Sequence, residues 1–326
     1  MAGKAISRRQ RLGNQTGSLA DALASQGIYI ALFLVLIVAR FLSQAFYQSA
    51  NILNMLRQAS ALGILSIGQT IVMIGGGIDL SVAATMQLAT IGVAELSKGG
   101  GMQVVFAVAI VLLLSALVGL INGWMVTHFK VPPFVATLFV GAVITGARLV
   151  YTKATPSGVL PASIRVIGRD STGPIPNAAL IFILLAVAAD IIIRRTVFGR
   201  KLFATGGNSQ SAWLSGVSTN RIQLTTYILS GLLAGMGGLV LAGYVGYADQ
   251  WIGRGYELDS VAAVVIGGTS FAGGRGSILG TVAGVLLVSV LLNLVLLLNL
   301  NVQWQLVVKG LVIILAVALY SFRRKV

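Results

Sequence analysis

Residues Glu257–Gly284 read ELDSVAAVVIGGTSFAGGRGSILGTVAG, and the rest of the chain can be organised around them. The stretch opens with two acids, runs apolar, and is then broken by two glycine pairs, Gly267–Gly268 and Gly273–Gly274, before a second apolar run begins. Glycine allows sharp turns and close backbone contact. Irregular backbone at membrane depth survives only where protein packs around it or where it lines a cavity. The stretch therefore predicts two helices joined by a tight glycine-rich hinge.

The composition is that of a polytopic membrane protein. Apolar residues make up 56% of the 326 residues and charged residues only 10%, whereas a soluble domain carries about 25% charged residues. Forty glycines are typical of closely packed membrane helices. The net charge of +15 could indicate a nucleic-acid partner. However, the basic residues lie at the ends of apolar runs rather than in one patch, so they are better explained as determinants of membrane topology.

The apolar runs predict an all-α transmembrane helical bundle of about ten spans, because each crossing needs about 20 mostly apolar residues. The bundle covers residues 28–322, preceded by a cytoplasmic segment, 1–27, and followed by a cytoplasmic basic tail, 323–326. The first run resembles a signal peptide, but many more runs follow and we expect an uncleaved span. The expected spans are 28–46, 58–75, 80–97, 103–126, 133–152, 177–193, 223–246, 259–272, 277–299 and 304–322.

The positive charges predict that both termini are cytoplasmic. With ten spans, fourteen of the 23 Lys and Arg residues fall in inside segments and six in outside segments, and the other three lie within spans. Cytoplasmic loops carry an excess of Lys and Arg, so this bias fits an even number of spans with both ends inside. An eight-span arrangement would keep the same orientation.

The longest inside loop, residues 194–221, contains a candidate docking element. Ser209–Leu214 is expected to form a short helix, with Asn208 as its N-cap and Gly216 as its stop. A basic loop with a short helix could receive a soluble partner on the cytoplasmic face. The alternative is an ordinary positively charged loop, and composition alone favours that alternative.

The sequence also contains two similar segments. Gly77–Ala84, GIDLSVAA, resembles Gly255–Ala263, GYELDSVAA, with one residue inserted. Each segment opens a predicted span, and five spans separate the two, so the halves would run in opposite directions. This pattern indicates an inverted internal repeat, which is a common plan in transporters. Coincidence among small apolar residues is the alternative.

Six segments resemble the membrane permease subunits of bacterial ABC importers for monosaccharides, the ribose and xylose group. GGIDLSV and VVIGGTSFAGGRGSILGTVAG are together the most specific of them. The six segments are Asn51–Gly63, Gly76–Val82, Gly119–Gly123, Val131–Leu138, Phe198–Gly216 and Val264–Gly284.

This resemblance implies a permease that works as a pair, as a homodimer or heterodimer, in the bacterial inner membrane. Two ABC ATP-binding subunits would lie beneath the pair, and a periplasmic sugar-binding protein would deliver the substrate. Phe198–Gly216 would seat on the ATPase, and a bulky residue at Gly207 is expected to uncouple hydrolysis from transport. The expected coupling residues are Gly199, Arg200, Gly206, Gly207, Asn208, Leu214, Ser215 and Gly216.

Two departures from the family pattern bear on this implication. Ser209, Gln210 and Trp213 stand where the family usually has an acid, an alanine and an arginine, so the salt bridges of coupling are in doubt while the location of the dock is not. Ala83 replaces the glycine that usually ends GGIDLSVG, and slightly tighter packing is expected at that turn.

A sugar crossing the bilayer needs polar groups without a fixed charge, because a strong binding site would trap it. Small hydroxyls and bare glycine backbone have this character, but glycine-rich stretches are also common packing surfaces. The hypothetical substrate path comprises Asp79, Ser81, Asn122, Gly267, Gly268, Thr269 and Ser270.

Several kinds of chemistry lack the residues they need. The sequence has no G-x-x-x-x-G-K-[ST] motif, so ATP is expected on partner subunits, with no cofactor in this chain. It has no cysteine and a single histidine, His128, so neither a metal site nor a nucleophile–base pair is expected. The main rival is an ion-coupled secondary transporter of a small polar solute. Such a carrier would need acids inside its spans, and only Glu95 lies well within one.

Overall fold

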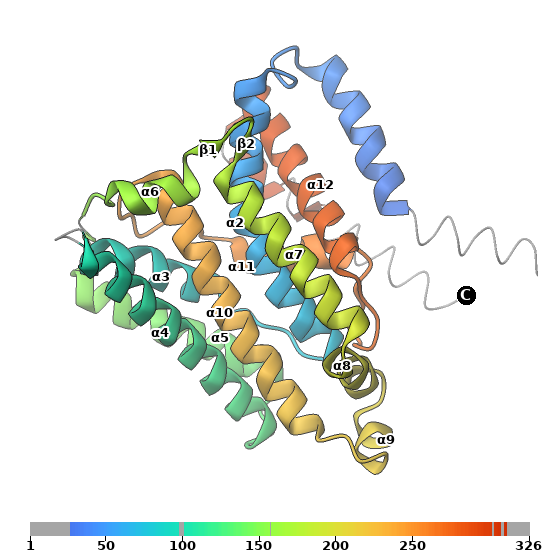
Figure 1. Cartoon of the computed structure of the whole chain (residues 1–326). Coiled ribbons are helices and arrows are strands. Elements are labelled where there is room, and N and C mark those ends of the chain that lie inside the picture. Colours follow the sequence, from blue (N-terminus) through green and yellow to red (C-terminus); the bar gives the residue numbers. More distant parts are fainter. Residues whose placement is uncertain (1–26, 98–100, 157, 302, 308–309, 312–326) are drawn as a thin grey trace, which may run out of the picture.

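The computed structural model describes residues 27–97, 101–156, 158–301, 303–307 and 310–311. The N-terminal segment and the basic tail, both expected to be cytoplasmic, lie outside these residues apart from Gly27, as does most of the tenth predicted span. The described part is a helical bundle with one small hairpin (Figure 1). After a first helix, Gly27–Leu42, its elements are α2 Ser49–Ile74, α3 Val82–Leu96, α4 Met102–Thr127, α5 Pro133–Thr152, α6 Ala162–Gly168, β1 Ser171–Thr172, β2 Ile175–Pro176, α7 Asn177–Arg195, α8 Val197–Gly207, α9 Ser209–Leu214, α10 Thr219–Val245, α11 Tyr256–Ile266 and α12 Ile278–Leu297.

Two helices, α2 and α10, form the centre of the bundle (Figure 1). Every residue of α2 from Ala59 to Ile74 is buried, including its polar ones. Helix α10 meets α4 along a seam of small residues four positions apart, with Gly231 and Gly235 facing Ser115 and Gly119. A Cβ added at Gly231 would overlap the carbonyl oxygen of Ser115. Small residues therefore bring the two backbones into contact, as is common between membrane helices.

The outer helices expose apolar side chains. Helices α4, α5, α7, α10 and α12 are long and apolar enough to cross a membrane, and only 22% of the most apolar window of α5 is buried, against 61% for α10. Large apolar side chains such as Phe106 on α4 and Leu184 on α7 are exposed, as lipid contact requires. A multi-pass, all-α membrane protein is thus confirmed. Ten spans are not confirmed, because two further apolar helices, Gly27–Leu42 and Val82–Leu96, are shorter.

The predicted eighth span, 259–272, is wrong. Helix α11 ends at Ile266 after 11 residues, which is about 16 Å at 1.5 Å per residue, roughly half the hydrocarbon thickness. Gly267 closes the helix and packs against the backbone of Gly280 on α12, and Gly268 then takes a φ of +90°. The chain turns back within the protein before it can cross, so the glycine-rich hinge is correct and the full span before it is not.

The inverted repeat is not confirmed either. In the first of the two similar segments, Gly77–Ala84, Ser81 is the N-cap of α3 and the helix starts at Val82. In the second copy, α11 already starts at Tyr256, so the matching Ser260 lies inside the helix. The two similar segments therefore occupy different positions relative to their helices.

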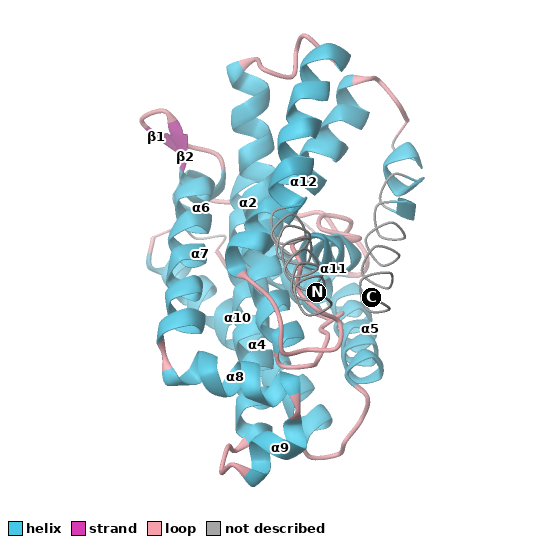
Figure 2. Ribbon diagram, turned by 90° about the vertical axis from the view of Figure 1, so that its right-hand side faces the viewer, coloured by secondary structure: helices cyan, strands magenta, loops and turns pink. Residues whose placement is uncertain are grey.

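Helix α7 separates two polar regions of the molecule. The hairpin of β1 and β2 lies directly before α7, and α8 and α9 follow its other end (Figure 2). With 19 residues, α7 is about 28 Å long, close to the thickness of a bilayer core. The hairpin and α9 should therefore lie on opposite sides of the membrane.

Single cysteines at Ser171, in the hairpin, and at Gln210, in α9, should react with a membrane-impermeant maleimide from opposite sides. Both positions are exposed, and the chain has no native cysteine that could add background labelling. Labelling in intact cells and in inverted membrane vesicles measures the side for each variant. Modification of both variants from the same side would contradict the placement of α7 as a span.

Candidate translocation and coupling sites

The glycine-rich loop, residues 267–277, is a compact turn held by its own hydrogen bonds. The amide of Ser270 donates to the carbonyl of Arg275 at 3.0 Å, and the Ser270 hydroxyl accepts from the Ala272 amide at 3.1 Å. At its end, the Ser277 hydroxyl accepts from the Gly280 amide at 3.3 Å and caps α12. The loop thus has its own fixed shape between α11 and α12.

Three glycine-bearing segments meet where this loop touches the bundle, and we call this contact the glycine junction: Gly76, Gly206–Gly207 and Gly273–Gly274. The Gly274 amide donates to the carbonyl of Ile74, the last residue of α2, at 2.9 Å. A Cβ on Gly206 would overlap that same carbonyl oxygen, and a Cβ on Gly273 would lie 2.6 Å from the Gly206 oxygen. The end of α2, the end of α8 and the loop are therefore in direct backbone contact.

The candidate coupling loop folds as its cap residues predict. Asn208 is the N-cap of α9, its side chain accepting from the Ser211 amide at 2.8 Å, and Gly216 has a φ of +82° after the helix. The predicted short helix Ser209–Leu214 is confirmed residue for residue. Helix α8, before it, is anchored by Leu202, whose side chain is fully buried.

The expected coupling residues divide into two groups by exposure. Gly199 is buried because its Cα lies against the backbone of Ile193, and Gly206 is half-buried in the glycine junction. The others are exposed, namely Arg200, Gly207, Asn208, Leu214, Ser215 and Gly216.

Helix α9 also presents an apolar tip. The side chains of Trp213 and Leu214 are 65% and 71% exposed. Trp213 borders a cavity of about 640 Å³ together with Lys130, which sequence reasoning did not connect with the loop. The other lining residues belong to the loop itself: Ser209, Gln210, Ser218, Thr219, Asn220 and Arg221.

Three of the expected path residues lie together in a buried polar network. Asp79 accepts hydrogen bonds from the Ser81 amide (3.0 Å), the Ser81 hydroxyl (2.7 Å) and the Ser230 hydroxyl on α10 (2.8 Å). The Asn122 amide on α4 donates to the Ser81 hydroxyl at 2.7 Å. All four side chains are buried. The network ties the start of α3 to α4 and α10, so its evident effect is to position α3.

Sequence reasoning missed Ser230, and it also missed the contact of this turn with α5. The amide of Leu80 donates to the hydroxyl of Thr137 at 3.1 Å. Ser230 is one serine in an apolar helix, and nothing in its local sequence distinguishes it from a packing residue. Only its pairing with Asp79, 151 positions away, gives it a role.

The other expected path residues lie in the glycine-rich loop and differ among themselves. Gly267 packs against α12, while Gly268 is exposed. Thr269 is buried beside Gly276, and its hydroxyl has no hydrogen-bond partner within the described part of the chain. Ser270 is buried and shapes the turn. Packing and turn formation account for Gly267 and Ser270, and a role of Gly268 or Thr269 in the path stays a prediction.

A second cavity, of about 570 Å³, lies between α3, α5 and the segment that leads into α11. We call it the α3–α5 groove. None of the expected path residues lines it. Its lining residues are Leu80, Ala83, Ala84, Gln87, Phe134, Leu138, Gly141, Thr145, Arg148, Leu149, Gln250, Trp251, Arg254, Glu257 and Leu258.

Comparison with known proteins gives a consistent result. Residues 51–317 match the family described as branched-chain amino acid transport system / permease component. The ribose import permease protein RbsC of Bacillus subtilis (strain 168) is 39% identical over 90% of this chain and 91% of its own length. RbsC of Escherichia coli (strain K12) is 36% identical over 90% and 93%. The galactose/methyl galactoside import permease protein MglC of the same organism is 31% identical over 92% and 95%. No solved structure gave a significant match.

The glycine junction predicts opposite outcomes for two adjacent glycines. Gly206→Ala should disrupt the contact between α8 and α2, because its Cβ would overlap the Ile74 carbonyl. Gly207→Ala is the matched control, since a Cβ there meets nothing within 4 Å. The expected effect of a bulky residue at Gly207 on coupling stays a separate prediction. Gly206→Ala should lower the melting temperature of the purified protein by several degrees, as about 1–3 kcal/mol of overpacking would, and Gly207→Ala should not. Equal melting temperatures would contradict the junction.

Proposed function

The chain belongs to the family described as branched-chain amino acid transport system / permease component, and we propose that it is the membrane permease subunit of an ATP-driven (ABC) importer for a monosaccharide. The observation that carries this proposal is the similarity to sugar import permeases over nine-tenths of the chain. The chain is a transporter component rather than an enzyme. Among the described residues, no group of three or more His, Cys, Asp or Glu side chains could hold a metal ion.

A sugar is favoured over an amino acid as the substrate. The family description refers to branched-chain amino acids, but three relatives that are 31–39% identical are named for ribose and for galactose and methyl galactoside. Identity at this level over nine-tenths of both chains is closer evidence than a shared family. D-Ribose and D-galactose are therefore the first substrates to test.

The proposed partners are two ABC ATP-binding subunits, a periplasmic sugar-binding protein and a second permease subunit. The ATPase contact is proposed at α9. Its exposed Trp213 and Leu214 suit a protein partner, because exposed aromatic and aliphatic side chains beside a cavity are typical of interface anchors. This contact would place α8, α9 and both termini in the cytoplasm, with the β1–β2 hairpin on the outside of the inner membrane.

The structure gives little support to an ion-coupled carrier. Such a carrier needs acids that are available to an ion inside the membrane. Asp79 already accepts three hydrogen bonds, and Asp190 forms a salt bridge with Arg194 at 2.8 Å. Glu95 also has a partner. These acids therefore have structural partners, which is a poor arrangement for ion binding.

Reconstitution with the ATPase and the binding protein tests the proposal. Proteoliposomes should take up D-ribose or D-galactose only when ATP and sugar-loaded binding protein are both present. Uptake that follows an ion gradient without ATP would contradict the ABC assignment.

A single substitution tests the docking site within this experiment. Leu214→Asp puts a charge at the exposed tip of α9, so it should sharply reduce the amount of ATPase that co-purifies while leaving membrane insertion intact. Val159→Asp is the control, because Val159 is equally exposed, at 74%, but lies before α7, on the hairpin side. Equal co-purification of the ATPase with both variants would place the dock elsewhere.

A further inference from the structure

The α3–α5 groove gathers polar side chains beside two apolar helices. It lies between α3 and α5 and is closed on one side by the segment before α11. Polar and ionisable side chains within membrane helices are costly and usually mark a functional pathway. Its polar residues come from three separate parts of the chain, α3, α5 and the segment leading into α11: Gln87, Thr145, Arg148, Gln250, Arg254 and Glu257.

Arg148 is the most telling of these residues. It lies inside the predicted span of α5, four residues before the end of the helix, and ionisable side chains within membrane spans are rare and usually functional. The side chain is only 6% exposed, yet one guanidinium nitrogen donates to the carbonyl of Gln250 at 3.0 Å and Nε has no partner in the described part of the chain. No acid forms a salt bridge with it among the described residues. Arg148 thus keeps donor capacity that the protein itself does not use.

An amide in the same groove is also unsatisfied. Oε1 of Gln250 is buried without a partner in the described part of the chain, and Gln87, which is 7% exposed, lines the groove as well. Thr145 donates its hydroxyl hydrogen to the Gly141 carbonyl at 2.9 Å, which leaves its oxygen free to accept. Buried polar groups in native proteins are normally hydrogen-bonded. Unused donors and acceptors that line one cavity therefore point to a polar ligand or to water in it.

Aromatic surface borders these polar groups. Trp251 is 60% exposed, with the guanidinium of Arg254 stacked 4.9 Å from its ring centre, and Phe134 is exposed on α5. A monosaccharide has hydroxyls that both donate and accept, and C–H faces that pack on aromatic rings. The groove combines both kinds of surface, and Glu257 adds an acceptor at its border.

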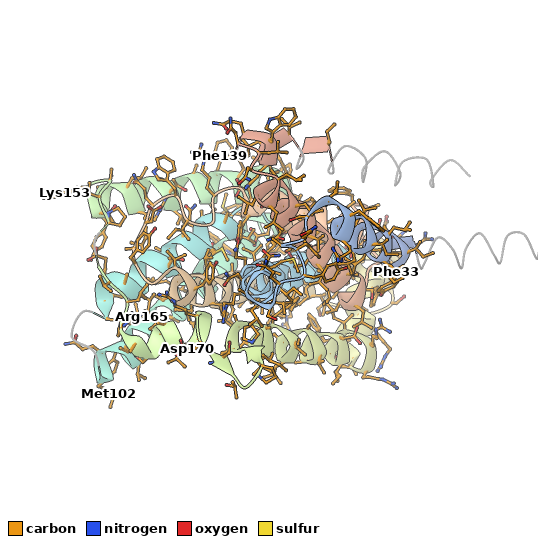
Figure 3. All side chains as sticks on the ribbon, turned by 90° about the horizontal axis from the view of Figure 1, so that it is seen from above. Phe33, Met102, Phe139, Lys153, Arg165 and Asp170 are labelled. Atoms are coloured by element: carbon orange, nitrogen blue, oxygen red, sulfur yellow. The ribbon has the colours of Figure 1, made fainter. Side chains whose placement is uncertain are left out.

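The groove also lies on a side of the bundle that is open among the described helices. Helix α5 is the least buried of the candidate spans and runs along one edge of the molecule, with Phe139 at that outer edge (Figure 3). A second permease subunit on this edge would close the groove into an enclosed path.

We propose that the α3–α5 groove carries the sugar across the membrane, with Gln87, Thr145 and Arg148 hydrogen-bonding its hydroxyls in transit. Arg148 departs from the expectation that the path holds no fixed charge. This inference rests on the proposed function and names the surface that performs it. In this proposal the groove, rather than the buried Asp79 network, contacts the substrate. The Asp79 network supports the groove by positioning its α3 wall.

Uptake by matched variants on α5 tests the groove. Thr145→Val removes a hydroxyl inside it, and Thr152→Val removes an equivalent one outside it, since both hydroxyls bond the carbonyl four residues before at 2.9 Å. Thr145→Val and Gln87→Leu should each lower the uptake of D-ribose or D-galactose about 2- to 10-fold, as the loss of one hydrogen bond implies. Thr152→Val should transport normally, and ATP hydrolysis stimulated by the binding protein should persist in all three variants.

A second measurement does not depend on the choice of sugar. Thr145→Cys should react with a charged methanethiosulfonate reagent, which modifies thiols in water, whereas Val143→Cys, exposed on α5 outside the groove, should not. If the wild-type complex carries neither sugar, the proposed substrate fails, and the reactivity of the Thr145→Cys variant still decides whether the groove is a water-filled path. If transport is normal but Thr145→Val behaves like Thr152→Val, or if both cysteine variants react equally, the groove is not the path.

Discussion

The contact on which the account depends is the hydrogen bond from the Gly274 amide to the Ile74 carbonyl, within a junction built from glycine backbone. Side chains between two elements can change rotamer and absorb a displacement. Three backbones in direct contact have no such freedom, because close-packed interiors transmit strain rather than yield to it. The glycine junction therefore joins the end of α2, the end of α8 and the loop between α11 and α12 into one unit. A displacement of α8 and α9 by a partner would be transmitted through this unit to the C-terminal end of α11.

The same structure accounts for polar groups inside an apolar protein in two contrasting ways. Around Asp79, the carboxylate accepts three hydrogen bonds within the protein, and the result is a fixed start for α3 held by α4, α5 and α10, with Oδ1 of Asn122 left without a partner among the described residues. Along the α3–α5 groove, Arg148 and Gln250 retain unused hydrogen-bonding groups. Satisfied networks make a structure rigid, whereas unsatisfied groups need water or a ligand. The Asp79 network supports the α3 wall of the groove, and the unused groups in the groove serve the passing sugar. Helix α3 takes part in both.

The sequence predicted what depends on local chemistry. The apolar runs predicted most of the helices, and the cap residues predicted α9 to the residue, because an N-cap acts on amides only two or three positions away. The failures depended on distant contacts. Helix α11 ends early because Gly267 meets Gly280, and a run of hydropathy cannot show that meeting. Ser230 donates to Asp79 from 151 positions away, so the sequence around Ser230 could not predict this hydrogen bond. The groove combines residues from α3, α5 and the approach to α11, so no single stretch of sequence predicted it.

The central claim, that α8 and the glycine-rich loop move as one unit, can be measured directly with spin labels. Lys201 on α8 and Arg275 in the loop are both exposed, and Phe129, after α4, provides a reference outside the junction. Pulsed electron–electron double resonance on the assembled complex, with and without ATP, gives the distances between pairs of labels. The account predicts that the distance between labels at 201 and 275 stays constant while the distance from each label to 129 changes. A change between 201 and 275 as large as the change to 129 would contradict it.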